Sequence, residues 1–592
     1  MFDFHFIYTV VLLFLMTILL IRDVFEPDII MFAVLVLMAV GGVITVEEAF
    51  AGFSNTGMLT VMFLFIVAAA LQQTGILNKI GDKVFGGDGK LSFKLFRFLA
   101  PVAAISAFFN NTPIVAMFIP AINAAARKGN FSVSKFMIPL SYASILGGMS
   151  TLIGTSTTLV VHGLLVAEGR DGFGFFEILK IGVPLVIVGV IFISFVGHRL
   201  LPNRKTPIVQ LGEHTREFVI EMKVEKNYRH IGKTIANAGL RHLTGLYLFQ
   251  IERRGEILSP VGPQERIKLG DRLFFTGLPE TILELQKTEG LSLLEDAVFN
   301  LKNYDSDELG VFEVVISANS PLIGQNVRNS QFRTRYDAVI LAIHRSGERI
   351  QKKIGDIVLR SGDTLLILSK KDFAGKWYHS KDFYLVSRTN GLPSKPKWHT
   401  WFSFAVLFTM IVFLATGILP ILVSVCFASL LLIVSKTISP EEARKSVNWS
   451  VLLVIASAFG IAEGMSNSGF AEFLAHQLAH IFGPMGPLGL LAGIYIITSI
   501  YTLIITNNAA AALVFPVVLS LATSNIVTDP RPFFITLAIA ASASFASPIS
   551  YQTNLMVYGP GGYKFADFLK IGLPMNVFVG IATVLLVHHF YF

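Results

Sequence analysis

The sequence contains little charge and almost no cysteine. Charged residues make up 15% of its 592 positions and hydrophobic residues make up 53%, whereas a soluble domain carries about 25% charged residues. The single cysteine, Cys426, lies in an apolar run, which excludes a disulfide scaffold and a cysteine-based zinc site. The composition therefore predicts a membrane protein.

The motifs of common enzymes are also absent. The sequence has no nucleophile elbow, phosphate-binding loop or HExxH motif, so we expect neither an enzyme nor an organic cofactor in the membrane part. His476 and His480 are four residues apart without an acidic partner motif, which favours a solvated outer face over a metal site. The net charge of +8 is explained by the positive-inside bias of membrane loops and needs no nucleic-acid partner.

The charges are concentrated in the middle of the chain. Residues 203–396 hold 52 of the 88 charged residues, and the other 398 positions hold only 36. We therefore predict a soluble insert between two membrane parts. The expected domains are an N-terminal membrane repeat (1–202), two insert modules (203–300 and 301–396) and a C-terminal membrane repeat (397–592).

Apolar runs of about 20 residues, the length that crosses a bilayer, occur six times on each side of the insert. The run from Phe6 to Ile21 has no basic segment before it and no small-residue cleavage site after it, which favours a retained helix over a signal peptide. The runs lie near 5–22, 28–45, 56–74, 92–126, 135–166 and 175–200, and near 400–417, 419–436, 448–466, 486–522, 530–558 and 567–590.

The two sets of runs match residue by residue. Asn110-Asn111-Thr112 and Pro120 recur 396 positions later as Thr506-Asn507-Asn508 and Pro516. The same offset relates the segments 157–163 and 553–559, and an offset of 394 relates Glu47-Glu48-Ala49 to Glu441-Glu442-Ala443. An offset this constant indicates a duplicated membrane unit.

Two runs in each half are interrupted by polar residues, glycine or proline. The interruptions are Asn110–Pro113, Thr506–Asn508, Gly147–Thr157 and Ser547–Asn554. Non-helical backbone at membrane depth is tolerated only where protein surrounds it or a polar cavity adjoins it. We therefore predict a polytopic α-helical membrane protein with a re-entrant hairpin and a broken helix in each half.

If each hairpin enters and leaves on one side of the membrane, each half crosses the membrane five times. Because five is odd, the second half is inverted relative to the first, which gives an inverted-topology repeat. In this arrangement Glu47, Glu48 and a loop at 467–485 without Lys or Arg face one side. The positive-inside rule then predicts a multi-pass protein of the inner (cell) membrane with a cytoplasmic insert and both termini outside. The basic residues on the insert side are Lys79, Lys83, Lys90, Arg127, Lys128, Lys436, Arg444, Lys445 and Lys564.

The insert also repeats itself. Gly270-Asp271 recurs 92 positions later as Gly362-Asp363, and 231–233 and 255–256 recur at the same offset. Each copy combines β-rich runs with a Gly-Asp turn, which predicts two small α+β modules of roughly 80 residues. The expected strands are Leu246–Ile251, Arg272–Thr276, Ala338–Ile343 and Thr364–Leu368.

The four membrane breaks are the main candidate site. A helix that begins at mid-depth presents free N–H groups and a positive dipole end to an anion, and unwound carbonyl groups offer oxygens to a small cation. Asn and Thr side chains add oxygens without a fixed charge. The breaks therefore predict a site for a small anion and sodium, although isolated small polar residues in membrane helices more often serve helix packing.

These breaks carry a resemblance to a known family. The segments Ser106–Pro113, Leu152–Thr157, Ile505–Ala510 and Gln552–Leu555 resemble the divalent anion/sodium symporter (DASS) family of the ion transporter superfamily. Only the central Asn of the family's Ser-Asn-Thr hairpin motif is kept in both halves. The resemblance implies a homodimer with an elevator-type transport domain.

The resemblance also implies site residues. Substrate contacts are implied for Asn111, Thr112, Thr155, Ser156, Thr157, Asn508, Thr553 and Asn554. Sodium contacts are implied for Asn110, Asn111, Gly154, Thr506, Asn507 and Ser550. The insert is similar to two TrkA C-terminal (RCK-C type) domains, which implies small-ligand binding and regulation of transport; a stabilising or dimerising appendage is the alternative.

We therefore expect a sodium-coupled symporter in the lipid bilayer, with sulfate as the first substrate and a dicarboxylate as the second. A cation/proton antiporter or an oxyanion efflux permease of the same superfamily is the alternative. A proton-coupled version requires a titratable acid in the core, for which Glu463 is the one candidate in the sequence. A channel or sensor gated by the insert is a third possibility, which the duplicated hairpins disfavour.

Overall fold

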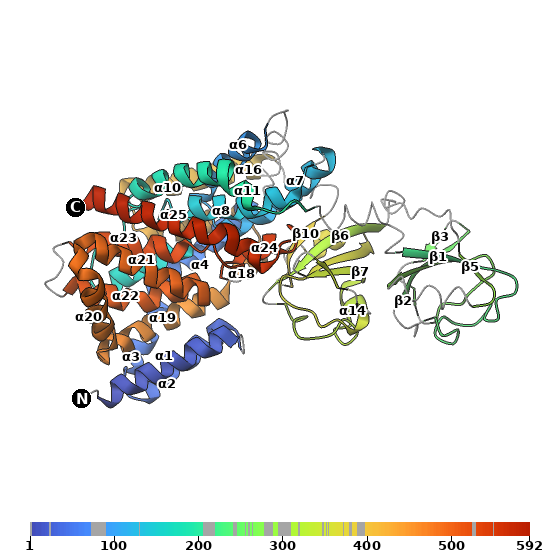
Figure 1. Cartoon of the computed structure of the whole chain (residues 1–592), viewed down its shortest axis with the longest axis horizontal. Helices are drawn as coiled ribbons and strands as arrows, with labels where there is room; N and C mark the ends of the chain where they lie inside the picture. Colours follow the sequence, from blue (N-terminus) through green and yellow to red (C-terminus); the bar gives the residue numbers. More distant parts are fainter. Residues whose placement is uncertain are drawn as a thin grey trace.

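The computed structural model shows a helical body and, beside it, two small β-sheet modules (Figure 1). Lys79, Lys83 and the C-terminal linker of the insert lie outside the described residues. The structure describes the chain except for 1–2, 23–24, 73–89, 130, 205–218, 241–245, 255, 259–260, 263, 278–287, 294–308, 318–319, 346–347, 351, 353, 371, 378–379, 381, 388–396, 524–528 and 549.

The helices of the first half precede the insert. They are α1 (Phe4–Arg22), α2 (Pro27–Val40), α3 (Val46–Ala51), α4 (Thr56–Gln72), α6 (Leu91–Ser106), α7 (Asn111–Gly129), α8 (Met137–Gly148), α9 (Ser156–Ala167), α10 (Leu179–Phe192) and α11 (His198–Leu200). The second half contains α16 (Lys397–Thr416), α17 (Ile421–Val434), α18 (Pro440–Ser446), α19 (Trp449–Asn467), α20 (Phe470–Phe482), α21 (Gly486–Ile504), α22 (Asn507–Thr523), α23 (Arg531–Ser542), α24 (Gln552–Tyr558) and α25 (Phe565–Tyr591).

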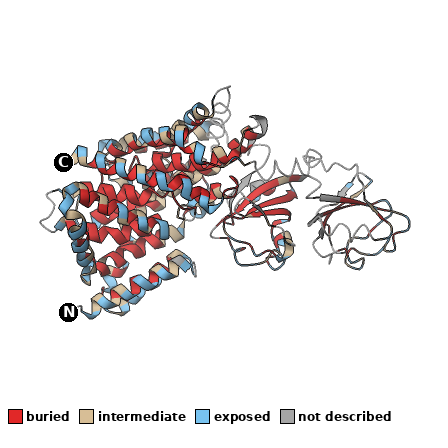
Figure 2. Ribbon diagram, in the orientation of Figure 1, coloured by how far each residue is buried: buried red, intermediate tan, exposed pale blue. Residues whose placement is uncertain are grey.

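The helical body has the surface of a membrane protein. Six helical segments in the described part of the chain are long and apolar enough to span a bilayer. Large apolar side chains such as Val40, Val434 and Ile581 point outward from the helices, whereas buried residues fill the interior (Figure 2). The predicted multi-pass helical membrane protein is therefore confirmed.

One sequence interpretation was wrong. The segment 467–485, which we expected to be a loop, contains helix α20. Ala471, Ala475 and Leu478 of this helix are buried, whereas Glu472 and His476 are exposed. The one-sided spacing of its apolar residues is typical of an amphipathic surface helix, which a search for long apolar runs does not detect. His476 and His480 are both exposed, as predicted.

The matching acidic segments of the two halves have the same local role. At the start of α3, Thr45 accepts a hydrogen bond from the Glu48 backbone, and the Glu48 side chain accepts one from the Thr45 backbone. Ser439 and Glu442 form the same reciprocal pair at the start of α18. Each pair is a capping box, which satisfies backbone donors at a helix start.

The insert forms two five-stranded antiparallel sheets within the described residues. The first sheet has the order β3-β2-β4-β1-β5, and the second, read from its opposite edge, has the equivalent order β8-β7-β9-β6-β10. The first sheet contains β1 (Val219–Val224), β2 (Leu246–Arg253), β3 (Glu256–Leu258), β4 (Arg272–Gly277) and β5 (Leu291–Leu293). The second contains β6 (Leu309–Ile316), β7 (Ala338–Arg345), β8 (Glu348–Arg349), β9 (Thr364–Lys370) and β10 (Phe383–Ser387).

The four predicted strands are present, and the two sheets share details. Each module has an ion pair between the end of its second strand and the Gly-Asp turn. Arg253 Nε lies 2.8 Å from Asp271 Oδ1, and Arg345 Nε lies 2.7 Å from Asp363 Oδ1. Gly270 and Gly362 both have positive φ angles, +82° and +80°, which glycine adopts without strain.

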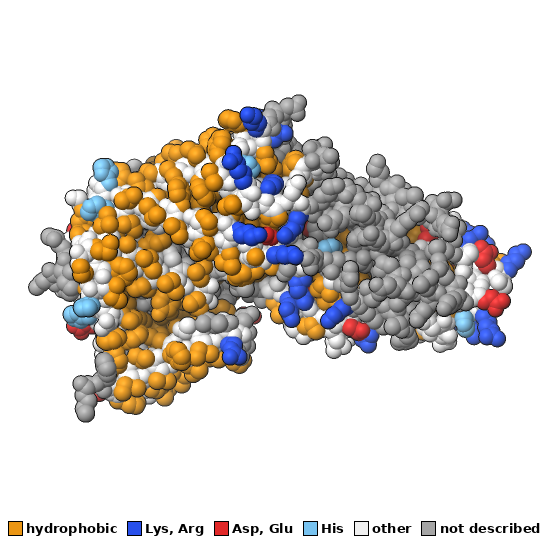
Figure 3. All heavy atoms as spheres, viewed as in Figure 1, with side chains coloured by type: hydrophobic (Ala, Val, Ile, Leu, Met, Phe, Trp, Pro, Cys, Tyr) orange, Lys and Arg blue, Asp and Glu red, His pale blue; other side chains and the backbone are white. Residues whose placement is uncertain are grey.

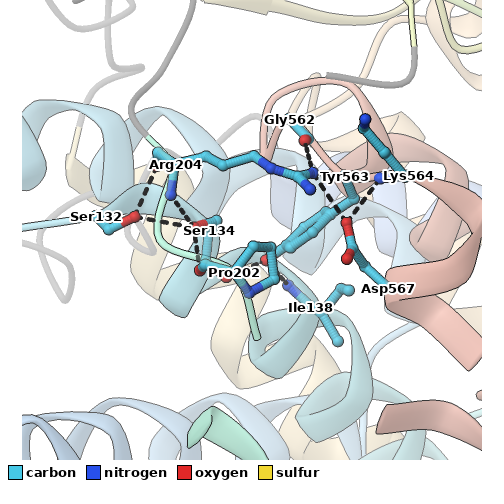
Figure 4. A network of polar contacts seen from close by, with 9 residues as sticks. All are labelled: Ser132, Ser134, Ile138, Pro202, Arg204, Gly562, Tyr563, Lys564 and Asp567. Atoms are coloured by element: carbon cyan, nitrogen blue, oxygen red, sulfur yellow. Dashed lines mark hydrogen bonds and ion pairs between the residues drawn. The ribbon is translucent and has the colours of Figure 1, made fainter. Parts of the chain in front are cut away.

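A polar network joins the end of the first half to the second half (Figure 4). Arg204 donates to Asp567 Oδ2 at 2.8 Å and to the Gly562 carbonyl. The Tyr563 hydroxyl accepts from the Ile138 backbone at 3.1 Å and donates to the Ser134 carbonyl. Asp567 is 6% exposed, so removing Arg204 would leave a largely desolvated carboxylate without its cation.

Candidate functional site

The helices are interrupted at all four predicted places, but in each case the next helix begins inside the predicted segment. Helix α7 begins at Asn111, α9 at Ser156, α22 at Asn507 and α24 at Gln552. The preceding helices end at Ser106, Gly148, Ile504 and Ser542. The backbone N–H groups of a first helical turn lack partners within the helix. The breaks therefore place four helix starts among polar side chains.

Two side-chain pairs join these helix starts across the duplicated halves. Thr112 Oγ1 at the start of α7 donates to Gln552 Oε1 of α24 at 3.1 Å. Ser156 Oγ of α9 donates to Asn508 Oδ1 of α22 at 3.0 Å. Both members of one pair are 396 positions from their counterparts in the other. The start of α7 thus contacts α24, and the start of α22 contacts α9, so each contact joins the two halves.

The Asn111 side chain makes a further contact between the two halves. Its Oδ1 accepts from Ser106 Oγ at 2.6 Å, and its Nδ2 donates to the Tyr551 hydroxyl at 2.6 Å. A Cβ added at Gly148 would lie 2.7 Å from Asn111 Oδ1 and 2.8 Å from Thr155 Cγ2. Glycine at position 148 therefore lets the first hairpin tip approach the first broken helix.

Asn507, the counterpart of Asn111, is in a different state. It is 4% exposed, and within the described part of the chain its Nδ2 and Oδ1 have no hydrogen-bond partner. The Oγ1 of Thr506, beside it, is also buried without a partner there. Buried polar atoms without partners are costly in a folded protein unless water or a ligand pairs with them.

The second broken helix is fixed by residues of the first half. Ser141 Oγ of α8 lies 2.8 Å from Thr553 Oγ1 and 2.7 Å from Asn554 Oδ1. Asn554 Nδ2 donates to the carbonyl groups of Ser544 and Ser547 at 2.9 and 3.0 Å. These contacts hold the unwound segment between α23 and α24 in one conformation.

The first broken helix is fixed in a similar way. Thr155 Oγ1 lies 3.0 Å from Thr158 Oγ1 and 3.2 Å from Ser542 Oγ of α23. A Cβ at Gly154 would overlap the Gly148 carbonyl and lie 3.0 Å from the Ala107 carbonyl. Because the carbonyl oxygens of Gly148 and Ala107 approach Gly154 so closely, a larger residue there would displace the segment.

The structure thus brings most of the residues expected at the site into contact with other polar groups. Asn110 Oδ1 accepts from the Thr112 backbone at 3.3 Å, and Ser550 Oγ accepts from Ser544 Oγ at 2.7 Å. Thr157 is buried, but its side chain makes none of the hydrogen bonds of the described residues. Glu463, on α19, is only partly buried and takes no part in this network.

Sequence reasoning missed several residues of the site. Tyr551 and Gln552 are the counterparts of Thr155 and Ser156 at the offset of 396, so the repeat contained a signal for them. Gly148 lies inside a predicted break, and Ser106 begins one of the segments that carry the family resemblance. Ser141 lies inside the apolar run of α8, where nothing in the sequence distinguishes it from a packing serine.

An apolar recess lies beside the polar network. Phe65 and Ala68 of α4, Leu159 of α9, and Leu407 and Met410 of α16 contribute to its wall. Asn110 and Ser156 lie at its polar end. None of the side chains in the contacts above carries a formal charge, so the helix starts are the sources of positive potential among these contacts.

Comparisons with known proteins find relatives that match most of the chain. A family model described as a citrate transporter (CitMHS) matches residues 12–539. The chain is 35% identical to a Chlamydomonas reinhardtii protein named "Putative sulfur deprivation response regulator", over 95% of this chain and 98% of the relative. It is 34% identical to "Uncharacterized transporter sll0640" of Synechocystis, over 94% and 92%. It is 26% identical to "Sodium/sulfate cotransporter 1" of C. reinhardtii, over 92% and 85%.

Proposed function

Because the chain belongs to the citrate transporter family, we propose that it is a sodium-coupled symporter of a small divalent anion. Sulfate is the first candidate substrate and a dicarboxylate the second. The family makes the protein a membrane transporter and not an enzyme. A relative that matches 92% of this chain is named for sodium and sulfate, which supports sulfate over the citrate of the family description.

The observation that carries the proposal is the convergence of helix starts. Helices α7, α9 and α22 have 19, 12 and 17 residues, and their first residues contribute to the two cross-repeat pairs. Positive dipole ends and free N–H groups at such helix starts favour an oxyanion. The hydroxyl and amide groups of Thr112, Ser156 and Asn508 add hydrogen bonds without a fixed cation.

Asn507 and Thr506 are the best candidates for a sodium contact. Their side-chain oxygens are hard, uncharged ligands, and within the described residues they are buried without hydrogen-bond partners. Asn111, by contrast, already has two partners. We therefore propose that a sodium ion contacts the second hairpin tip more directly than the first. Gly154, Asn110 and Ser550 remain proposed sodium contacts on the resemblance alone.

The proposed membrane topology is the inverted repeat with a cytoplasmic insert and domains at 1–202, 203–300, 301–396 and 397–592. Two observations support it. Both ends of the chain lie at the end of the helical body away from the insert (Figure 1). On the visible face, Lys and Arg side chains gather at the end next to the insert (Figure 3), as the positive-inside rule requires.

The mechanism that we propose is an elevator-type movement in a homodimer of the cell membrane, regulated by the insert as TrkA C-terminal-like modules. A proton antiporter is the weaker alternative, because Glu463 lies outside the polar network of the breaks. An oxyanion efflux permease would use the same residues and differ in the direction of net flux.

Uptake into proteoliposomes tests the proposal. Labelled sulfate, succinate, citrate and phosphate are offered with an inward sodium gradient, with an equal potassium gradient and with a proton gradient. We expect sulfate uptake that requires sodium. Uptake driven by protons alone would overturn the sodium coupling, and sodium-driven uptake of citrate alone would overturn the choice of substrate.

A further inference from the structure

The second insert module contacts a helix of the substrate site. A Cβ added at Gly362, in the Gly-Asp turn before β9, would lie 2.9 Å from Leu555 Cδ1 of α24. A Cβ added at Gly559, directly after α24, would overlap Thr364 Oγ1 and lie 3.0 Å from the Gly362 carbonyl oxygen. The turn and the end of α24 therefore touch, and two glycines allow the approach.

One face of the second sheet is buried together with this turn. Val315 of β6 is fully buried and belongs to the same apolar cluster as the membrane helices. In the sheet, Thr364 of β9 lies opposite Val315 on one side and His344 of β7 on the other. All three are less than 4% exposed. In Figure 1, β6 and β10 adjoin α24.

The first module differs at the corresponding positions. Lys223 stands where the second module has Val315, Arg272 where it has Thr364, and Glu252 where it has His344. Arg272 Nη1 lies 2.9 Å from Glu252 Oε1, and the arginine side chain is 39% exposed. A Cβ at Gly270 would meet no atom within 4 Å. In the first module this face carries Lys, Arg and Glu side chains and is partly exposed. In the second module it carries Val, Thr and His side chains and is buried.

We propose that the second module is docked on α24 and thereby positions Thr553 and Asn554, the residues of α24 in the substrate site. This inference deepens the proposed function and rests on it for the role of these two residues. Helix α24 has only seven residues, too few for a stable helix on its own. Ser141 holds its N-terminal end, and the Gly362–Thr364 turn packs against its C-terminal end.

A cysteine pair tests the docking without any transport measurement. The Thr364 Cβ lies 3.3 Å from the Cβ position at Gly559, close to the separation in disulfides of about 3.5–4.5 Å. In a Cys426→Ser background, Thr364→Cys with Gly559→Cys should form a disulfide in the full-length protein in membranes. Arg272→Cys with Gly559→Cys is the matched control and should not. Absence of the first disulfide, or equal yields for the two pairs, would overturn the docking.

Exchanging residues between the copies tests the positioning. Thr364→Arg introduces the first module's residue into the docked face, and Arg272→Thr makes the reverse change in the open face. For Thr364→Arg, we expect faster amide hydrogen exchange in 552–559 but not in α22. Sulfate affinity should fall about three- to tenfold, the equivalent of roughly one hydrogen bond. Thr364→Ser should behave like the unmodified protein. Arg272→Thr removes the ion pairs to Glu221 and Glu252 within the first module and should leave amide exchange in 552–559 unchanged.

The readouts separate this inference from the proposed function. Unchanged exchange in 552–559 for Thr364→Arg would overturn the positioning whatever the substrate is. If the unmodified protein binds neither sulfate nor a dicarboxylate, the proposed function fails, while the disulfide and exchange results still decide whether the module docks on α24 and orders it. If Thr364→Arg does not fold, amide hydrogen exchange is measured instead in the Thr364→Cys, Gly559→Cys variant, once oxidised and once reduced. We expect slower amide exchange in 552–559 after oxidation. Equal amide exchange in the two forms would overturn the positioning.

Discussion

Asn111 and Asn507 occupy the same position in the two halves, yet among the described residues the Asn111 amide has hydrogen-bond partners and the Asn507 amide has none. The repeat explains this difference between the two asparagines. Tyr551, whose hydroxyl accepts from Asn111, is replaced at the equivalent position by Thr155, which bonds to Thr158 and Ser542 instead. The duplicated site is therefore asymmetric: protein groups satisfy the Asn111 amide, and among the described residues none satisfies the Asn507 amide.

This asymmetry predicts different outcomes for two identical substitutions. In sodium-free buffer, Asn111→Ala should lower the melting temperature in detergent because it removes two buried hydrogen bonds, each worth about 0.5–1.5 kcal/mol. Asn507→Ala should leave it unchanged or raise it, since the amide that it removes has no partner in the described part of the chain. Added sodium should stabilise the unmodified protein but not Asn507→Ala. Equal destabilisation of both variants without sodium would contradict the asymmetry.

Ser141 is predicted to support substrate binding from outside the breaks. Ser141→Ala removes the hydroxyl that contacts both Thr553 and Asn554. We expect the half-saturating sulfate concentration to rise about two- to tenfold, the value of one or two neutral hydrogen bonds. Ser144→Ala, on the same helix, is the control and should have little effect, because the Ser144 hydroxyl has no partner among the described residues. Uptake kinetics at a fixed sodium concentration measure the half-saturating sulfate concentration of both variants. An equal rise in Ser141→Ala and Ser144→Ala would show that Ser141 has no special role.

Gly148 is predicted to be intolerant of any side chain. In Gly148→Ala, the new methyl group would lie 2.7 Å from Asn111 Oδ1 and 2.8 Å from Thr155 Cγ2, closer than van der Waals contact. We expect sulfate binding to fall below detection while the protein still reaches the membrane. Gly483→Ala is the matched control, because a Cβ there would meet no atom within 4 Å. Unimpaired binding by Gly148→Ala would show that the two elements can move apart.

Replacing residues 207–394 with a flexible linker should weaken substrate binding without abolishing it. The cross-repeat pairs lie outside the insert, and Arg204 remains to contact Asp567, but α24 loses the module that covers its end. Isothermal titration of the purified variant with sulfate measures the effect, and gel filtration shows whether it is folded. A well-folded variant without detectable binding would mean that the insert forms part of the substrate site itself.

The sequence alone determined the duplication and the places where the membrane helices break. Polar residues within long apolar runs are costly in lipid, so Asn110–Pro113 and Thr506–Asn508 indicated interruptions, and a constant offset related them. Helices α7 and α22 begin inside these segments, at Asn111 and Asn507. The strands of the insert were predicted from its β-rich runs and its Gly-Asp turn, which recur at a constant offset of 92. Helix α20 was missed because its apolar residues cover only one face.

The tertiary structure decided which of these residues meet. Asn111 and Tyr551 are 440 positions apart, and Ser141 and Thr553 are 412 apart, so no local pattern pairs them. Sequence symmetry also suggested equal roles for Asn111 and Asn507, which packing made unequal because tyrosine reaches one amide and threonine does not reach the other. The docking of only one insert module likewise depends on which sheet face meets α24. Such contacts arise from the packing of whole elements, and residue type and spacing do not specify them.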